Sequence, residues 1–326
     1  MFVKNKIMLK AKKRKIIVIL GPTASGKTKL AVELARKFNG EIVSADSRQV
    51  YKGMNIGTGK DLKEYIIKSQ IANRKSQINK IPYHLIDVVN PKQEFNVAKY
   101  QKLAYKAIDD ILTRGKLPVL VGGTGLYLQA VVDGYQLSKA RSNKKLREKL
   151  EKTSVEKLFK MLSRLDYKKA NGLNESDKKN KRRLIRYIEV AQAPKNPAKR
   201  DQRTPSYDFL IIGIKKDKEE TRKRIYKRLI ERLEKEDMIG EVKKLHKSGA
   251  SWKRLESFGL EYKFISLYLR GKLSYNEMVE KLNIAIGQFA KRQMSWFRRW
   301  ERQGAKIYWI KNTREGKKLI KIFLKK

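Results

Sequence analysis

The chain has 326 residues, enough for one large core with an accessory domain, and 40% of them are hydrophobic. Its 79 basic and 33 acidic residues give a formal net charge of +46, a field that attracts polyanions such as nucleic acid. A lysine-rich proteome would explain the same charge without such a partner. The sequence contains no cysteine, which excludes disulfides and Cys-based zinc sites.

Membrane attachment and secretion are not indicated. No stretch approaches the ~18 apolar residues of a membrane-spanning helix. Residues 1–15 are basic but lack the continuous apolar run of a signal peptide. We therefore expect a soluble cytoplasmic protein without a membrane partner.

The first part of the chain alternates between strand and helix patterns. Residues 15–20 (KIIVIL) are short, β-branched and apolar, which is typical of a buried parallel strand. After a glycine-rich turn, apolar residues at helical spacing predict a helix over 27–40, with Gly40 as its C-terminal stop. Residues 41–46 predict the second strand of the same sheet.

This alternation continues, with a helix predicted over 98–114 and a third strand within 116–125. The order indicates an α/β fold, a P-loop NTPase-like doubly wound parallel sheet, whose ligands gather at the carboxyl ends of the strands. A polar stretch at 60–80 is expected to be a surface insertion.

Beyond residue 130 the pattern changes to basic helices. The predicted elements are a basic helical region up to about 200, a Pro-punctuated linker at 193–208, a strand at 208–215 and basic helices at 217–248 and 275–302. We therefore expect three segments: the first part of the core at 1–130, a helical insertion domain at 131–205, and the second part of the core at 206–326.

The sequence GPTASGKT at 21–28 fits the phosphate-loop pattern G-x-x-x-x-G-K-[ST]. Its glycines let backbone N–H groups surround phosphate oxygens, Lys27 adds a point charge, and Thr28 can bind Mg²⁺. The helix N-terminus that follows favours an anion as well. A chance glycine turn is the structural alternative. The residues expected to bind phosphate are Gly21, Pro22, Thr23, Ala24, Ser25, Gly26, Lys27 and Thr28.

Two further polar residues are predicted at strand ends beside this loop. Asp46 could bind Mg²⁺ through water or accept a proton from a substrate, although a turn or N-cap role is equally compatible with its position. Thr124, in GGTGLYL, could face the same site or simply form a strand-to-helix turn. No apolar strand here ends in the aspartate of a Walker B motif, which weakens an ATPase interpretation.

Basic clusters offer candidate nucleic-acid contacts. Arg182 and Arg186 lie on one face of a predicted helix, where a solvated face is the alternative. The block at 290–300 (AKRQMSWFRRW) interleaves arginine with aromatic residues, which suits either base stacking or core packing. His84 has no neighbouring catalytic partner in sequence and is interpreted as a structural, hydrogen-bonding residue.

Several blocks together resemble one family, the tRNA dimethylallyltransferases, also called tRNA isopentenyltransferases. They occur in the family's order over most of the chain: GPTASGKT, GEIVSADSRQVYKGMNIGTGK, PYHLIDVVNP, GKLPVLVGGTGLYL, RRLIRYIEV and FAKRQMSWFRRW. The SADSRQVYKGM and AKRQMSWF blocks are more specific than the phosphate loop. The absence of cysteine indicates a bacterial-type member without the zinc-binding extension of eukaryotic relatives.

This resemblance implies that the loop binds the pyrophosphate of dimethylallyl diphosphate rather than ATP. The implied reaction transfers the dimethylallyl group to N6 of the adenosine 3′ of the tRNA anticodon, giving N6-isopentenyladenosine and diphosphate. It implies that Asp46 accepts the N6 proton and that Thr23 helps to hold the adenine. Mg²⁺, bound through Thr28, is the implied cofactor.

The resemblance also carries over contacts to the tRNA. The implied tRNA-binding residues are Asp46, Ser47, Arg48, Gln49, Thr124, Arg147, Arg182, Arg183, Leu184, Ile185 and Arg186. Arg228 matches a position that faces the pyrophosphate, and a monomer is expected. The segment at 257–264 (SFGLEYKF) departs from the compact GYKE or GYRQ stretch of many members by two additional residues.

Two other functions are compatible with parts of this pattern. A P-loop kinase for a nucleoside or small metabolite fits the loop and the sheet, but leaves the charge, the basic insertion and the AKRQMSWF block unexplained. A non-catalytic RNA-binding protein on a relic P-loop fold fits the charge, but gives Asp46 no role.

Overall fold

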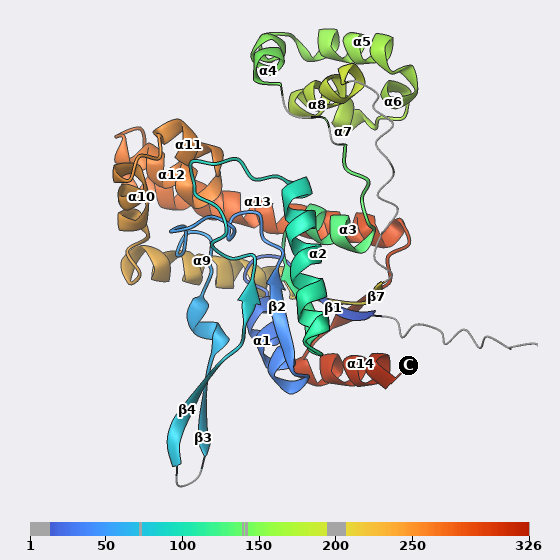
Figure 1. The fold of residues 1–326 in the computed structure, drawn as a ribbon. Helices are drawn as coiled ribbons and strands as arrows, with labels where there is room; N and C mark the ends of the chain where they lie inside the picture. Colours follow the sequence, from blue (N-terminus) through green and yellow to red (C-terminus); the bar gives the residue numbers. More distant parts are fainter. Residues whose placement is uncertain (1–13, 72–73, 139, 141–142, 194–206, 326) are drawn as a thin grey trace, which may run out of the picture. The chain divides into compact units, whose positions relative to one another are not determined.

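The computed structural model describes residues 14–71, 74–138, 140, 143–193 and 207–325 (Figure 1). Contacts divide the chain into two compact units. Residues 1–135 and 205–326 form one, called the core unit, and residues 136–204 form the other, called the helical unit. Among the described residues, every helix is too short or too polar to cross a membrane.

A six-stranded parallel sheet forms the centre of the core unit, with the strand order β5-β2-β6-β1-β7-β8. Its strands are β1 (Arg14–Leu20), β2 (Gly40–Ser44), β5 (Tyr83–His84), β6 (Leu117–Gly122), β7 (Tyr207–Ile214) and β8 (Ile307–Ile310). In register, Val18 of β1 lies between Leu120 and Ile211 of its two neighbours. The predicted α/β class is confirmed, and so are the predicted strands within this sheet.

Helices cover both faces of this sheet. The helices of the core unit are α1 (Lys27–Lys37), α2 (Val97–Thr113), α3 (Gly125–Val132), α9 (Lys218–Glu234), α10 (Met238–Lys247), α11 (Trp252–Ser257), α12 (Leu260–Leu269), α13 (Tyr275–Arg302) and α14 (Thr313–Lys325). The polar 60–80 stretch forms the short 3-10 helix η1 (Leu62–Tyr65) and an antiparallel hairpin of β3 (Ile66–Ile71) and β4 (Arg74–Lys80), which extends away from the sheet in Figure 1.

Alternation along the buried strands creates two apolar layers because successive side chains point to opposite faces. Ile17 and Ile19 of β1 pack with α1 and α14, whereas Ile16 and Val18 pack with α2, α3 and the end of α13. A third apolar cluster joins helices α9 to α13 around residues such as Met238. The sheet is therefore covered by one apolar layer on each face, and the cluster formed by α9 to α13 packs beside its carboxyl edge.

The first helix ends earlier than the sequence predicts. Helix α1 stops at Lys37, and Asn39, with φ 49°, makes the left-handed turn that was expected of Gly40. Gly40 instead begins β2, where a Cβ atom would lie 2.7 Å from the carbonyl oxygen of Leu117. The glycine is therefore needed for close strand approach rather than for the turn. Most of the predicted linker at 193–208 lies outside the described residues.

The packing of α13 decides between base stacking and core packing for the aromatic residues of the block at 290–300. Phe297 and Trp300 are 0% and 1% exposed, and the Trp300 indole N–H donates to the Asp133 carboxylate. Arg292 and Arg298 lie on the exposed side of the same helix. Core packing, and not base stacking, accounts for these two aromatic residues.

The helical unit has a small core of its own. Its helices are α4 (Lys144–Glu151), α5 (Val155–Leu165), α6 (Tyr167–Asn171), α7 (Glu175–Lys178) and α8 (Lys181–Gln192). Leu158 and Leu162 of α5 pack against Leu184 and Ile188 of α8. Four of the five helices begin with an asparagine or serine N-cap and the fifth with Asp166, which supplies the first backbone N–H groups with acceptors.

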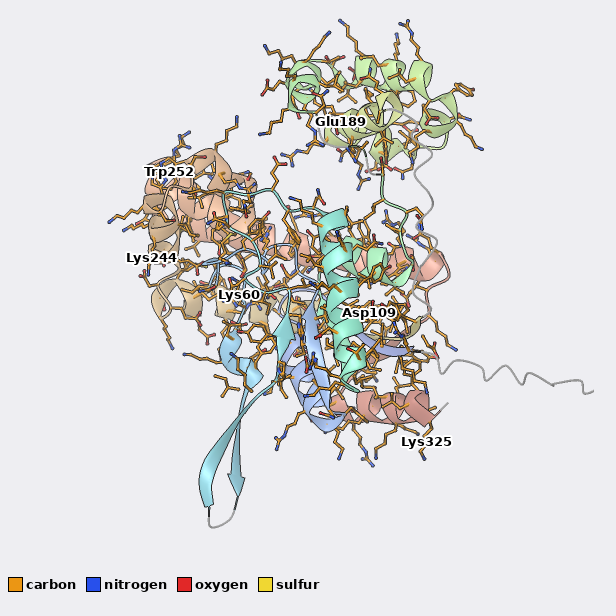
Figure 2. All side chains as sticks on the ribbon, in the orientation of Figure 1. Lys60, Asp109, Glu189, Lys244, Trp252 and Lys325 are labelled. Atoms are coloured by element: carbon orange, nitrogen blue, oxygen red, sulfur yellow. The ribbon has the colours of Figure 1, made fainter. Side chains whose placement is uncertain are left out.

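Most of the positive charge lies on the surface (Figure 2). Lys244 and Lys325, for example, are exposed. Lys60 is the contrasting case, because its side chain is 1% exposed and its ammonium group donates to Asp87, to Asn55 and to the Tyr51 carbonyl. Through these bonds, the buried Lys60 ammonium group holds the loop between Tyr51 and Lys60 against the rest of the core unit.

Truncating Trp300 to alanine is expected to lower the free energy of unfolding by about 3–5 kcal/mol, because a buried indole leaves a large cavity. Chemical denaturation monitored by circular dichroism measures the loss. The matched variant Arg298→Ala, on the exposed side of the same helix, should change stability by less than about 0.5 kcal/mol. Equal effects of the two variants would contradict the packing role assigned to Trp300.

Candidate active site

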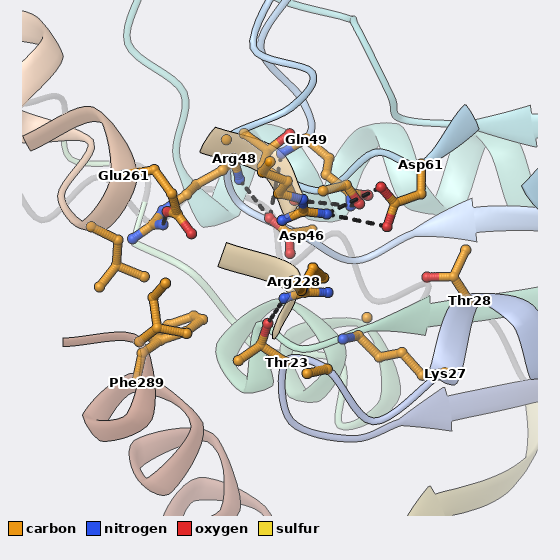
Figure 3. A pocket seen from close by; sticks show the side chains of 18 of the residues that line it. Thr23, Lys27, Thr28, Asp46, Arg48, Gln49, Asp61, Arg228, Glu261 and Phe289 are labelled. Atoms are coloured by element: carbon orange, nitrogen blue, oxygen red, sulfur yellow. Dashed lines mark hydrogen bonds and ion pairs between the residues drawn. The ribbon is translucent and has the colours of Figure 1, made fainter. Parts of the chain in front are cut away.

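A cavity of about 460 Å³ lies at the carboxyl edge of the sheet. The loops that follow β1, β2 and β6 form its floor, and helices α9, α12 and α13 contribute its walls. Figure 3 shows that Lys27, Asp46 and Arg228 point toward a shared space. The fold therefore brings together residues that are about 20 to 200 positions apart in the sequence.

The phosphate loop forms the end of the cavity that suits an anion. It turns into α1 at Gly26, whose φ of 85° lies in the left-handed region. Lys27 donates to the carbonyl of Pro22 at 3.3 Å, and Thr28 also lines the cavity. Burial lowers the pKa of Lys27 to about 8, partly offset by the Asp46 carboxylate. The loop thus holds a cation whose burial an anionic ligand would compensate.

A column of arginines from α9 faces this loop. Arg224 Nε donates to the carbonyl of Ala24 at 2.8 Å, and Arg228 donates to the Thr23 hydroxyl. Arg232, one turn further, pairs with Asp61 at 3.1 Å. Burial lowers the pKa of Arg228 to about 10, which still leaves it charged at neutral pH. The wall opposite the phosphate loop is therefore cationic.

Asp46 takes the turn role that its sequence position allowed, and it also lines the cavity. Its Oδ1 atom accepts from the backbone N–H of Arg48 at 2.9 Å and of Gln49 at 3.3 Å, which makes it a turn residue. Its Oδ2 atom has no hydrogen-bond partner among the described residues, and Asp46 lines the cavity. The turn fixes the carboxylate while one oxygen stays available to a substrate.

The neighbouring residues of this loop are held by side chains from elsewhere. Ser47 donates its backbone N–H to the Thr124 hydroxyl at 3.0 Å, so Thr124 contacts this loop from behind and is not among the residues that line the cavity. The Gln49 amide accepts from the Ser44 hydroxyl at 3.0 Å and donates to the Gly59 carbonyl at 3.0 Å. The Ser47 backbone and the Gln49 side chain are therefore held in place by contacts within the protein.

The segment at 257–264 runs from the last residue of α11 into the first turn of α12. Gly259, with φ 72°, turns the chain so that Glu261, 7% exposed, enters the cavity and pairs with Arg48 at 3.2 Å. The Tyr262 hydroxyl donates instead to Glu241 at 2.7 Å, and Lys263 is exposed. Within this segment, Glu261 contributes charge to the cavity, and Tyr262 supports the loop at 55–57 through Glu241.

Two of the four predicted arginines of the helical unit contact one buried acid. Arg147 forms two hydrogen bonds with Glu189, at 2.7 and 2.8 Å, and Arg186 pairs with it at 3.2 Å. Burial raises the pKa of Glu189, but the hydrogen bonds from Arg147, the Asn143 N–H and Arg186 lower it to about 2. Arg182 is exposed on the same helix.

The remaining predicted residues of this stretch differ in exposure. Leu184 and Ile185 are 0% and 3% exposed and belong to the core of the helical unit. Arg183 pairs with Asp177. Any contact of the 182–186 stretch with a ligand would thus come from its arginine side chains.

Sequence reasoning missed several residues of the cavity. Arg224 and Arg232 flank the predicted Arg228 at intervals of four, a spacing visible in RKRIYKRLIER. Phe289 and Gln293 lie four apart on α13, the second of them within the AKRQMSWF block. Helical periodicity could have placed each pair on one face, but only the fold shows that the face borders the phosphate loop.

The donor atoms near Thr28 suit a divalent cation that also binds phosphate oxygens. No group of three or more acidic, His or Cys side chains that could hold a metal alone is found among the described residues. Asp61 and Glu64 nevertheless line the cavity with Thr28, and burial, with the nearby Asp61, raises the pKa of Glu64. Hydroxyl and carboxylate oxygens are ligands that Mg²⁺ accepts, with water and phosphate oxygens completing its shell.

The fold and the cavity define a P-loop α/β protein with an anion site beside an available carboxylate. Comparison with protein-family models gives a finer assignment. The model described as "IPP transferase" matches residues 49–300, and the one described as "Isopentenyl transferase" matches residues 14–75. The chain belongs to the IPP transferase family.

Curated relatives and solved structures agree with this assignment. The chain is 49% identical to tRNA dimethylallyltransferase 1 of Syntrophus aciditrophicus, covering 91% of this chain and 93% of the relative. It is 48% identical to tRNA dimethylallyltransferase 1 of Geotalea daltonii, covering 90% of each. The full-length tRNA isopentenylpyrophosphate transferase of Bacillus halodurans is similar with a TM-score of 0.64 and 34% identity, over 95% and 94% of the two chains.

A eukaryotic dimethylallyltransferase acting on tRNA is similar as well. The TM-score is 0.68 at 28% identity, covering 87% of this chain and 69% of the eukaryotic one. The likeness therefore extends to an enzyme of another domain of life.

Proposed function

We propose that this protein is a tRNA dimethylallyltransferase that transfers the dimethylallyl group of dimethylallyl diphosphate to N6 of the adenosine 3′ of the anticodon. One observation carries the proposal: Asp46 Oδ2 is available in the cavity that the phosphate loop and Arg228 border. A base beside a diphosphate site is what transfer to an amine requires. Family membership and the names of the relatives support the choice of reaction.

The phosphate end of the cavity provides the leaving-group site. The phosphate loop, Lys27 and Arg228 border the same cavity, where they would stabilise the charge that a diphosphate gains as the C1–O bond breaks. Arg224 adds a second guanidinium next to the loop. Because these groups are fixed by the fold, they stabilise the developing charge without rearranging.

The acceptor amine would approach from the Asp46 side. The N6 nitrogen forms a bond to C1 of the dimethylallyl group while the C1–O bond to diphosphate breaks, and the excess N6 proton passes to Asp46 Oδ2. An exocyclic amine inside an RNA stack cannot reach a cavity of this kind, so the target base must leave the stack. Thr23, in the phosphate loop and bonded to Arg228, would help to hold the adenine.

Mg²⁺ fits this site as the cofactor. Thr28 would hold it through its hydroxyl, and Asp61 and Glu64 could contribute through water. When bound, it supplies charge neutralisation to the departing diphosphate.

The tRNA would be bound by basic residues of both units. In the core unit, Arg48 and its neighbours Ser47 and Gln49 line the cavity, so they would meet the target base. In the helical unit, Arg182 is exposed, and Arg147 and Arg186 surround Glu189, from which they could turn toward phosphate groups. The net charge of +46 supports a polyanionic substrate.

A transfer assay tests the proposal. Purified protein, Mg²⁺, dimethylallyl diphosphate and unmodified tRNA should yield isopentenyladenosine, detected by mass after RNA digestion. Asp46→Asn keeps an oxygen acceptor for the Arg48 N–H but lacks the base, so it should lose at least ~10²-fold in rate while binding tRNA within about threefold of wild type.

The control for this variant is Asp208→Asn, at the amino end of β7 and therefore at the opposite edge of the sheet. Its rate should equal that of the wild type. Equal rates for Asp46→Asn and wild type would refute the role of Asp46, and no product from the wild-type protein would refute the proposed reaction.

The pKa of Lys27 predicts a pH dependence of donor binding. Lys27 binds the diphosphate as a cation, so in the free protein this contribution is present below pH 8 and is lost as the pH rises through about 8. The affinity for dimethylallyl diphosphate should therefore fall about tenfold between pH 7 and pH 9. Calorimetry measures this fall, and Lys27→Met should bind weakly with no such step.

Salt dependence tests the helical unit. Replacing Arg182 and Arg186 by glutamine should weaken tRNA binding and lower the slope of log affinity against log salt by about one unit for each lost phosphate contact. Arg164→Gln, an exposed arginine on α5, serves as the comparison. An unchanged slope in the Arg182 and Arg186 variants would identify this cluster as a solvated helix face.

A further inference from the structure

We infer that Gln293 is a positioning residue that sets the distance between two loops. The first is the phosphate loop at residues 21–28, called the diphosphate loop below, and the second is the base loop at residues 45–49. This inference rests on the proposed function and assigns a task to a residue that bonds to the first loop and to the turn that supports the second. Gln293 lies on α13, more than 240 positions after the base loop, and is 6% exposed.

Both ends of the Gln293 amide are used. Its Oε1 atom accepts from the backbone N–H of Thr23, in the diphosphate loop, at 2.8 Å. Its Nε2 atom donates to the carbonyl of Gly123, in the turn after β6, at 2.9 Å. A planar amide is the group that can accept from one loop and donate to the next at the same time. Through this amide, α13 links two loops that are far apart in the sequence.

The turn after β6 carries this link on to the base loop. The Thr124 backbone N–H donates to the Ala45 carbonyl at 3.2 Å, and the Thr124 hydroxyl accepts from the Ser47 N–H. Gly122 lies so close that a Cβ atom would be 2.1 Å from the Ala45 oxygen. Ala45 and Ser47 flank Asp46 on both sides. A displacement of Gly123 would consequently move the carboxylate of Asp46.

The junction is also tight around Gln293. A Cβ atom at Gly123 would lie 2.3 Å from Gln293 Nε2, and one at Gly125 would lie 2.3 Å from Trp296, one turn further along α13. Trp296 itself donates to Gln129 at 3.0 Å. The helix therefore contacts the turn with two side chains, one turn apart on the same face, that leave no room for a Cβ atom at Gly123 or Gly125.

This geometry explains why an amide is placed here. Transfer requires the amine nitrogen, the allylic carbon and the leaving oxygen to be aligned, and a misplacement of about 1 Å can cost 10²-fold in rate. The diphosphate loop places the donor, whereas the base loop places the proton acceptor. Gln293 contacts the first loop directly and reaches the second through Gly123, so its effect should appear in the transfer step rather than in the binding of either substrate.

Gln293→Met tests this, because methionine has a similar length and no amide. Its single-turnover rate at saturating dimethylallyl diphosphate and tRNA should fall at least ~30-fold, while the dissociation constants of inorganic diphosphate and tRNA change by less than about threefold. Gln288→Met, an exposed glutamine on the same helix, is the matched control and should retain the wild-type rate.

Gln293→Glu gives a signature that a purely structural role would not produce. A protonated carboxyl can accept from the Thr23 N–H and donate to the Gly123 carbonyl, as the amide does, whereas the ionised form places an oxygen against that carbonyl. The rate of the variant relative to wild type should therefore be highest at low pH and fall at least tenfold as the carboxyl ionises. Gln288→Glu should show no such fall.

The outcomes separate this inference from the proposed function. A wild-type protein that makes no isopentenyladenosine refutes the proposed function. If the wild type is active, two results overturn the inference alone: transfer rates in both Gln293 variants equal to those of the Gln288 controls, or losses of rate that match losses of substrate affinity and are independent of pH. A pH-dependent loss of the transfer rate with retained binding supports it.

Discussion

The close approach of three loops at the carboxyl edge of one parallel sheet is the constraint on which the site depends. Parallel strands point their carboxyl ends to the same edge, so the loops after β1, β2 and β6 must share that space. Glycine makes this possible: at Gly122 a Cβ atom would overlap the Ala45 carbonyl oxygen, and at Gly123 it would overlap the Gln293 amide. Each loop is then fixed by its neighbours, and the side chains it carries keep defined positions before any substrate arrives.

Electrostatics divides the resulting cavity into two ends with different chemistry. Lys27 and the arginines of α9 make one end cationic, and burial depresses the pKa of both Lys27 and Arg228. Burying a cation without a full counter-ion costs free energy, and a bound anion would lower that cost. At the other end, Asp46 lines the cavity as the proposed proton acceptor, and Arg48 is held by Glu261. An anion and an amine are therefore favoured at opposite ends of one cavity.

The sequence predicts those parts that are encoded locally. Short apolar β-branched runs predicted the strands, the phosphate-loop pattern predicted the loop that carries Lys27 into the cavity, and the position of Asp46 after a strand predicted that it lies nearby. What escaped prediction depends on contacts across the chain. Glu261 enters the cavity only because Gly259 turns the chain at the start of α12, and Gln293 reaches Thr23 over 270 residues. The end of α1 was misplaced because Gly40 was assigned to a turn, when strand approach is what requires it.

Competition binding tests most directly the central claim that this phosphate loop serves an allylic diphosphate. Protein with Mg²⁺ is equilibrated with labelled dimethylallyl diphosphate or labelled ATP, and each is challenged with the other ligand unlabelled. We expect saturable binding of dimethylallyl diphosphate that Lys27→Met abolishes and that ATP displaces poorly. Tight ATP binding that dimethylallyl diphosphate does not reduce would contradict it, and would identify the loop as an ordinary nucleotide site.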